Sequence, residues 1–256
     1  NKFLQIKNCE VIKMKRKVVL ISGLVFIFLT FISFSIFAFS ENYKLGINSF
    51  NNKNYKKSIN HFNTYLKNNN PKLKINAKYY LGLNHLKLSQ YSNSVNYFKQ
   101  IKDKFNPKYK VLVNLGRSYY HLQNYSNAEE VLIKAKNIES RDEQIFNLLG
   151  LINLHKNKFF KSINLFKKAL DIDKNNYYIY NNLGYTYILK SEYKKAKKYL
   201  EKAISFNPEV SYIYNNLGIV YENSGEKDKA LKYYKKALTI NPKYEKAKKN
   251  LNRITN

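Results

Sequence analysis

The amino-acid sequence predicts an all-α protein made of stacked helical hairpins, with one apolar helix in front of them. Glycines mark a constant spacing of 34 residues, with one further glycine 36 residues ahead of the series: Gly46, Gly82, Gly116, Gly150, Gly184 and Gly218. The four prolines of the chain recur in a nearly constant phase relative to these glycines. A stretch of 23 residues, 18–40, carries no charged side chain. A fixed period of about 34 residues is typical of arrays of helical hairpins.

The composition is strongly basic. The 256 residues include 46 Lys and Arg against 17 Asp and Glu, which gives a net charge of +29. Two interpretations stay open, a solvated surface in a lysine-rich chain or a surface that attracts nucleic acid, anionic lipid or an acidic partner. A single cysteine, Cys9, excludes an internal disulfide framework and a thiolate metal cluster.

The first 40 residues predict a membrane anchor. Residues 1–17 form a short basic segment, and Met14 is the only methionine. Two interpretations stay open: translation naturally starts at Met14, or residues 1–13 form a short disordered cytoplasmic tail. As a helix, the 23 residues of the segment 18–40 would be about 34 Å long, enough to cross a hydrocarbon core of about 30 Å. Basic residues just before this segment predict a cytoplasmic N-terminus and exported repeats: Lys13, Lys15, Arg16 and Lys17.

A cleaved signal peptide is the alternative interpretation of the same segment. Ala38 and Ser40 supply small residues for a cleavage site. The apolar run is longer than the roughly 7–15 residues of a signal peptide. We therefore expect a transmembrane helix or signal anchor at 18–40, with a secreted repeat domain as the alternative.

Six repeat units follow when each glycine is set at place 8 of a 34-place unit. Their bounds are 39–72, 75–108, 109–142, 143–176, 177–210 and 211–244. In the fifth unit, each of two helices gathers its apolar and small residues on one face: Tyr180, Leu183, Gly184 and Tyr187 on the first, Ala196, Leu200 and Ala203 on the second. Pro208 ends the second helix.

The small residues have a packing reason. Glycine inside a helix costs about 1 kcal/mol relative to alanine, so its recurrence at place 8 indicates a close approach of two helices. Place 20 holds a small residue throughout, and place 27 is alanine in the last four units. Place 17 is aromatic in five units, and in the sixth it is Lys227, where we expect Gly225 to supply the turn.

This pattern resembles the tetratricopeptide repeat (TPR) over residues 39–244. The resemblance implies a right-handed α-solenoid of about six helical hairpins, with a concave groove lined by the first helix of each hairpin. Residues 245–256 are expected to form a capping helix, because Ala247, Leu251 and Ile254 share one face and the opposite face is polar. We expect the chain to be complete at this end.

The resemblance also places the candidate binding residues in the groove. A carboxamide offers one acceptor and two donors, so a row of asparagines suits the backbone of an extended peptide. Tyrosines add contact surface, and Lys110 and Arg117 favour an acidic segment. The predicted groove residues are Lys110, Asn114, Arg117, His121, Asn147, Tyr178, Asn181, Asn182, Tyr185, Tyr212, Asn215 and Asn216.

No arrangement of residues in the sequence indicates catalysis. His121 and His155 share place 13 of adjacent units, but no third ligand joins them, so we expect no metal, no cofactor and no enzyme activity. The sequence therefore predicts a membrane-anchored scaffold that binds a peptide or helix of a partner protein. Binding of anionic lipid or nucleic acid through the lysine-rich surface is the alternative.

Overall fold

The computed structural model describes residues 41–67, 71–206 and 208–255. The basic segment 1–17, the candidate start at Met14 and the predicted transmembrane segment 18–40 lie outside the described residues. Among the described residues, no helix combines the length and the apolar character that crossing a bilayer requires.

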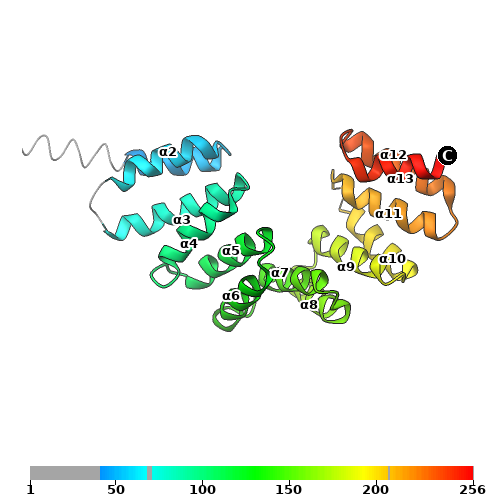
Figure 1. Cartoon of the computed structure of the whole chain (residues 1–256), viewed down its shortest axis with the longest axis horizontal. Coiled ribbons are helices and arrows are strands. Elements are labelled where there is room, and N and C mark those ends of the chain that lie inside the picture. Colours follow the sequence, from blue (N-terminus) through cyan, green and yellow to red (C-terminus); the bar gives the residue numbers. More distant parts are fainter. Residues whose placement is uncertain (1–40, 68–70, 207, 256) are drawn as a thin grey trace, which may run out of the picture. The chain divides into compact units, whose positions relative to one another are not determined.

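Every regular element of the described chain is a helix (Figure 1). Residues 41–51 are helical. The helices that follow are α2 (Tyr55–Leu66), α3 (Pro71–Lys87), α4 (Tyr91–Ile101), α5 (Lys108–His121), α6 (Tyr125–Ile138), α7 (Glu143–His155), α8 (Phe159–Ile172), α9 (Tyr177–Leu189), α10 (Tyr193–Ile204), α11 (Ser211–Asn223), α12 (Lys227–Ile240) and α13 (Glu245–Thr255). The prediction of an all-α array of helical hairpins is confirmed for these residues.

The chain divides into two compact units, 1–97 and 98–256, with the boundary inside α4. In the second unit the helices pack in consecutive pairs, α5 on α6, α7 on α8, α9 on α10 and α11 on α12, and α13 packs on α12. Each pair falls within one of the 34-residue units read from the sequence. The second unit therefore carries four hairpins and the helix that follows them.

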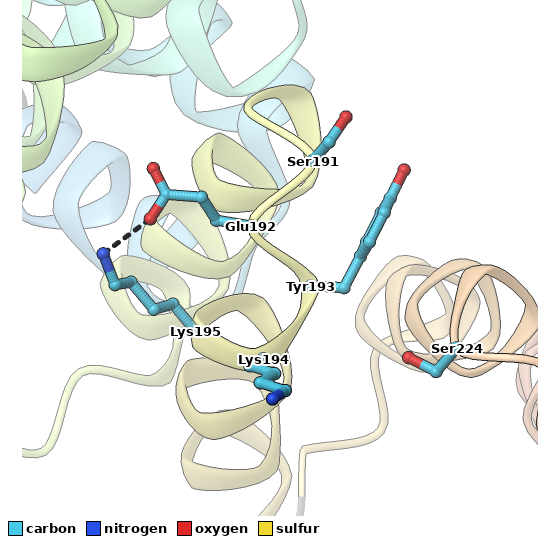
Figure 2. Close-up of a pocket in the computed structure, with 6 residues that line it drawn as sticks. All are labelled: Ser191, Glu192, Tyr193, Lys194, Lys195 and Ser224. Carbon is cyan, nitrogen blue, oxygen red and sulfur yellow. Dashed lines mark hydrogen bonds and ion pairs between the residues drawn. The ribbon is translucent and has the colours of Figure 1, made fainter.

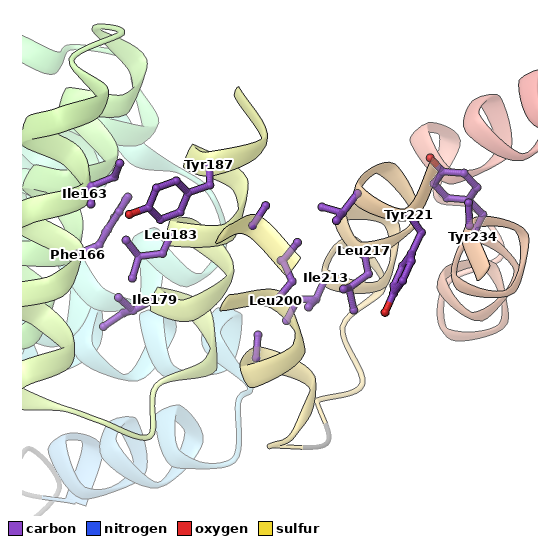
Figure 3. Close-up of a cluster of buried hydrophobic side chains, with 14 of the residues drawn as sticks. Ile163, Phe166, Ile179, Leu183, Tyr187, Leu200, Ile213, Leu217, Tyr221 and Tyr234 are labelled. Atoms are coloured by element: carbon purple, nitrogen blue, oxygen red, sulfur yellow. The ribbon is translucent and has the colours of Figure 1, made fainter. Parts of the chain in front are cut away.

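Glycines at place 8 mark points of close approach between the two helices of a hairpin. A Cβ atom on Gly184 would lie 2.5 Å from Cγ of Leu200, and one on Gly150 would lie 2.6 Å from Cε1 of Phe166. The facing residue stands 16 places after the glycine in both cases. These residues belong to a buried cluster that runs from Ile163 in α8 to Tyr234 in α12 (Figure 3). The close approach explains why glycine recurs at place 8.

Serine replaces alanine at place 20 in three repeats, and there it adds a hydrogen bond. The Oγ atoms of Ser58, Ser94 and Ser162 donate to the carbonyl oxygens of Gly46, Gly82 and Gly150 at 2.8, 2.9 and 2.9 Å. All three serines are fully buried. Because the hydroxyl has a partner on the facing helix, serine is as compatible with the close approach as alanine.

The turn inside each hairpin lies two places before the aromatic residue of place 17. The residue at place 15 has a positive φ in every repeat: Lys53, Ser89, Gln123, Asn157, Ser191 and Gly225. The aromatic residue instead begins the second helix, as Tyr193 begins α10. Gly225 is thus the one residue of this set that adopts the left-handed region without strain from a Cβ atom.

Candidate functional site

A pocket lies among the first helices of the last repeats. Its volume is about 290 Å³. It is lined from α9, from α11, and from α13 with the residue before it: Tyr185, Asn215, Asn216, Ile219, Tyr244, Lys246, Lys249 and Asn250. Three of the predicted groove residues, Tyr185, Asn215 and Asn216, therefore share one concave site.

Asparagines form a ladder of hydrogen bonds that leads into this pocket. Nδ2 of Asn182 donates to Oδ1 of Asn147, Nδ2 of Asn216 to Oδ1 of Asn181, and Nδ2 of Asn250 to Oδ1 of Asn215, each at 2.9 Å. Each bond joins place 6 of one repeat to place 5 of the repeat before it. The partners stand 35 residues apart, so every rung ties two neighbouring first helices together.

The rungs leave part of each carboxamide unused. One rung takes one N–H of the donor asparagine and one lone pair of the acceptor oxygen. In the rung between Asn250 and Asn215, the oxygen of Asn250 and the amino group of Asn215 take no part in the bond, and both residues line the pocket, with Asn215 only 2% exposed. The ladder therefore serves the packing of the repeats and also presents an acceptor and a donor side by side.

A row of tyrosines runs beside the ladder. Tyr178 and Tyr185 are 48% and 37% exposed, and the rings of Tyr177 and Tyr178 lie 4.2 Å apart. Burial raises the pKa of Tyr212 above its ordinary value, with smaller effects from Tyr178, Tyr177 and Tyr244. The pKa of Tyr244 is raised by burial and then by Tyr185. The raised pKa values keep the phenols of Tyr212 and Tyr244 neutral near pH 7. The tyrosines offer both ring surface and hydroxyl groups to a partner.

The charge of the pocket is positive. Lys246 and Lys249 line it, no acidic side chain does, and both lysines are exposed. In the described part of the chain neither lysine belongs to an ion pair, whereas Lys248 between them pairs with Glu245 at 3.2 Å. A ligand that carries a carboxylate fits this charge.

The predicted groove residues of the third repeat form a set of their own. Nδ2 of Asn114 donates to the carbonyl oxygen of Lys110 at 2.9 Å, and Arg117 donates from Nη1 to Oδ1 of Asn114 at 3.4 Å and from Nη2 to Gln144. Burial and then Arg117 lower the pKa of His121, which favours the neutral form of the ring.

The second histidine of place 13 has a packing role. The hydroxyl of Tyr120 lies 2.9 Å from Nε2 of His155, and the imidazole stacks on Tyr125 with 5.0 Å between ring centres. Among the described residues, no three side chains of His, Cys, Asp or Glu gather as metal ligands would.

Five residues of the pocket were missed by the sequence-based prediction: Ile219, Tyr244, Lys246, Lys249 and Asn250. The signal was present, because Asn250 stands 34 residues after Asn216 and α13 therefore continues the register of the first helices. The prediction ended the ladder at residue 244 and treated the following helix only as a cap.

We predict that the ladder contributes to stability as well as to binding. Asn216→Ala removes a donor and leaves the buried oxygen of Asn181 without its partner, at a cost of about 1–2 kcal/mol of unfolding free energy. Urea unfolding followed by circular dichroism measures this cost. The double variant with Asn181→Ala should cost less than the sum of the single variants. Asn223→Ala, which removes an exposed bond within α11 alone, is the control, and strict additivity at 181 and 216 would contradict the prediction.

The fold and this site define a helical-repeat protein with a concave pocket at its last repeats. Two family models, both described as tetratricopeptide repeat, match residues 109–142 and 143–176 in one case and 177–210 and 211–244 in the other. The matches cover more than half of the 256 residues. The chain belongs to the tetratricopeptide-repeat family.

Solved structures with the same architecture include the APC/C hetero-tetramer Cut9-Hcn1, with a TM-score of 0.77 and 18% identity over 84% of this chain and 42% of that one. MamA gives a TM-score of 0.54 and 25% identity over 65% of this chain and 97% of MamA. PilF of Pseudomonas aeruginosa gives a TM-score of 0.69 and 16% identity over 84% of this chain and 97% of the PilF chain. No curated protein matches the sequence. The chain thus spans less than half of the Cut9-Hcn1 chain it resembles, and these likenesses bear on the fold.

Proposed function

We propose that this protein is a membrane-anchored scaffold whose groove holds an extended segment of a partner protein. Residues 18–40 serve as a single membrane span, and the basic residues before them place the repeats outside the cytoplasm. A secreted repeat domain, released by cleavage after the apolar segment, is the alternative form of the same scaffold. The protein assembles partners and has no catalytic activity of its own.

The pocket at the end of the asparagine ladder carries this proposal. An extended peptide presents alternating N–H and C=O groups, and the unused amide groups of Asn215 and Asn250 offer the complementary acceptor and donor. Ile219 and Tyr185 supply apolar surface for a side chain. Lys246 and Lys249 select a carboxylate. The arrangement suits a peptide that carries Asp, Glu or its own C-terminus at this point.

Selection from a library of random peptides tests the proposal. The full-length protein in detergent is immobilised, and bound peptides are sequenced. We expect enrichment of peptides with acidic residues, and dissociation constants measured for them should rise about tenfold in the variant Lys246→Glu with Lys249→Glu, since two attractive contacts become repulsive.

A matched control separates the pocket from the general field of a basic protein. The variant Lys232→Glu with Lys236→Glu makes the same change in net charge on exposed positions of α12, a second helix of a hairpin. It should bind the selected peptides as the natural protein does. Equal weakening in both variants, or no enrichment at all, would contradict a peptide site at the pocket.

A further inference from the structure

One side chain on the surface has no explanation in the fold. Phe160 is 77% exposed, the highest value among the exposed large hydrophobic residues of the described chain. It stands at place 18, and the other five repeats carry a polar residue there, which is also exposed: Lys56, Ser92, Ser126, Lys194 and Asp228. The packing of the hairpin therefore does not require an apolar side chain at this place.

The surroundings of Phe160 are basic. It lies in an open pocket of about 690 Å³ lined by Asn157, Lys158, Phe159, Phe160, Lys161, Asn164 and Lys190, with three lysines and no acid. On one side, the carboxylate of Glu129 forms ion pairs with Lys156 at 2.5 Å and with Lys161 at 3.6 Å. On the other side Glu192 is shared by Lys190 and Lys195. Each acid is outnumbered, so the surface around the phenyl ring keeps a positive charge.

The corresponding pocket of the next repeat has the same position and a different chemistry. It is lined by Ser191, Glu192, Tyr193, Lys194, Lys195 and Ser224, and Glu192 forms an ion pair with Lys195 (Figure 2). Place 18 is Lys194 in this pocket, and place 16 is Glu192 where the fourth repeat has Lys158. The repeat geometry thus produces a pocket in both places. The pocket of the fourth repeat combines an exposed aromatic ring with three lysines and no lining acid, whereas the pocket of the fifth repeat contains Glu192.

We propose that this turn edge of the fourth repeat, formed by residues 157–161 with Asn164 and Lys190, docks on a bilayer that contains anionic lipids. An aromatic ring lowers its free energy by entering the boundary between headgroups and acyl chains. Lysines around it reach lipid phosphates, and each basic residue near an anionic surface contributes about a fivefold increase in binding. The positive charge of this surface is complementary to an anionic membrane. A single protruding ring can enter the lipid without a preformed cavity there.

The absence of tryptophan gives a specific probe for this contact. The sequence contains no Trp, so Phe160→Trp places the single tryptophan of the full-length protein at the proposed contact point, and its emission is read with excitation at wavelengths that tyrosine does not absorb. The protein is reconstituted in vesicles of phosphatidylcholine alone or of phosphatidylcholine with phosphatidylglycerol. We expect a blue shift of the emission, and quenching by brominated lipid, only in the vesicles with phosphatidylglycerol. Lys194→Trp, at the same place of the next repeat, is the control and should keep the emission of a water-exposed indole.

The lysines are tested on the same fluorophore. Adding Lys158→Glu and Lys161→Glu to Phe160→Trp should reduce the docked fraction by more than the roughly fivefold that one lost lysine gives. All of these positions are exposed or at the rim of the pocket, so the variants should fold. Emission from position 160 that matches the Lys194→Trp control in both kinds of vesicle would overturn the proposal. So would a shift that requires an added protein, because that outcome identifies a protein interface. Neither result depends on peptide binding in the groove.

Discussion

Gly184→Val is expected to lower the free energy of unfolding by about 3 kcal/mol. The glycine lies in α9 at a point where even a Cβ atom would come within 2.5 Å of Leu200 Cγ, and Leu200 is fully buried. Extra methyl groups in a well-packed core cost about 1–3 kcal/mol and at times more, and three carbons enter here. Urea unfolding followed by far-ultraviolet circular dichroism measures the loss.

A size exchange across the same contact provides the internal test. Leu200→Ala alone leaves a cavity and costs about 2–5 kcal/mol. The double variant Gly184→Val with Leu200→Ala carries the same number of side-chain carbons as the natural pair. It should therefore lose clearly less than the sum of the two single variants, with a coupling energy above about 1 kcal/mol. Additive losses would show that the glycine is not kept for this contact.

Gly225→Ala separates the packing effect from the backbone effect of a glycine. No atom lies within 4 Å of a Cβ built at Gly225, but its φ is +78°. The substitution should therefore cost about 1–2 kcal/mol through left-handed strain alone, and no second substitution should rescue it. In an array whose repeats contact only their neighbours, the loss at Gly184 should also reduce amide protection in α11, which packs on α10 and α9.

The repeat architecture was predictable because its cause is local and periodic. A glycine at place 8 and a bulky residue 16 places later belong to one hairpin, so the 34-residue period carries the contact between Gly184 and Leu200 in the sequence itself. The positive φ at place 15 was not predictable in the same way. Lys53, Gln123 and Asn157 adopt it without glycine, because the surrounding hairpin determines the backbone there.

The position of the candidate site was predictable from the sequence, and its chemistry only in part. The register identified Asn181, Asn182, Asn215 and Asn216 as groove residues. The register did not show that the asparagine at place 6 donates a hydrogen bond to the asparagine at place 5 of the previous repeat. That pairing depends on the stagger between packed hairpins. The exposed ring of Phe160 needed coordinates as well, since an aromatic pair in the sequence is equally compatible with burial. The anchor at 18–40 remains a prediction.

Two buried tyrosines bind carboxylates in the last repeats. The hydroxyl of Tyr234 donates to Oε2 of Glu222 at 2.5 Å, and Arg253 of α13 donates to the same oxygen at 2.7 Å. The hydroxyl of Tyr221 donates to Oε1 of Glu201 at 2.9 Å. Burial first, and then the accepting carboxylate, raise the pKa of both tyrosines above the ordinary value of about 10. The folded protein thus holds these phenols in the neutral form.

This coupling predicts a loss of stability at alkaline pH. Below pH 10 the folded and unfolded chains both keep the phenol protons, so the stabilising contribution is complete. Above pH 10 the unfolded chain releases them and the folded chain does not, so the unfolding free energy falls by about 1.4 kcal/mol per pH unit for each tyrosine until its folded pKa is reached. Urea unfolding between pH 7 and pH 11 measures the slope.

Lysines lose their charge in the same range, so the informative comparison is with Tyr221→Phe and Tyr234→Phe combined. That variant should be less stable at pH 7, because Glu201 and Glu222 lose donors. Its decline above pH 10 should be shallower by up to about 2.7 kcal/mol per pH unit, the sum for two protons. An equal slope in both proteins would mean that these hydroxyl groups ionise as readily in the folded chain as in the unfolded one, and that the carboxylate contacts do not hold their protons.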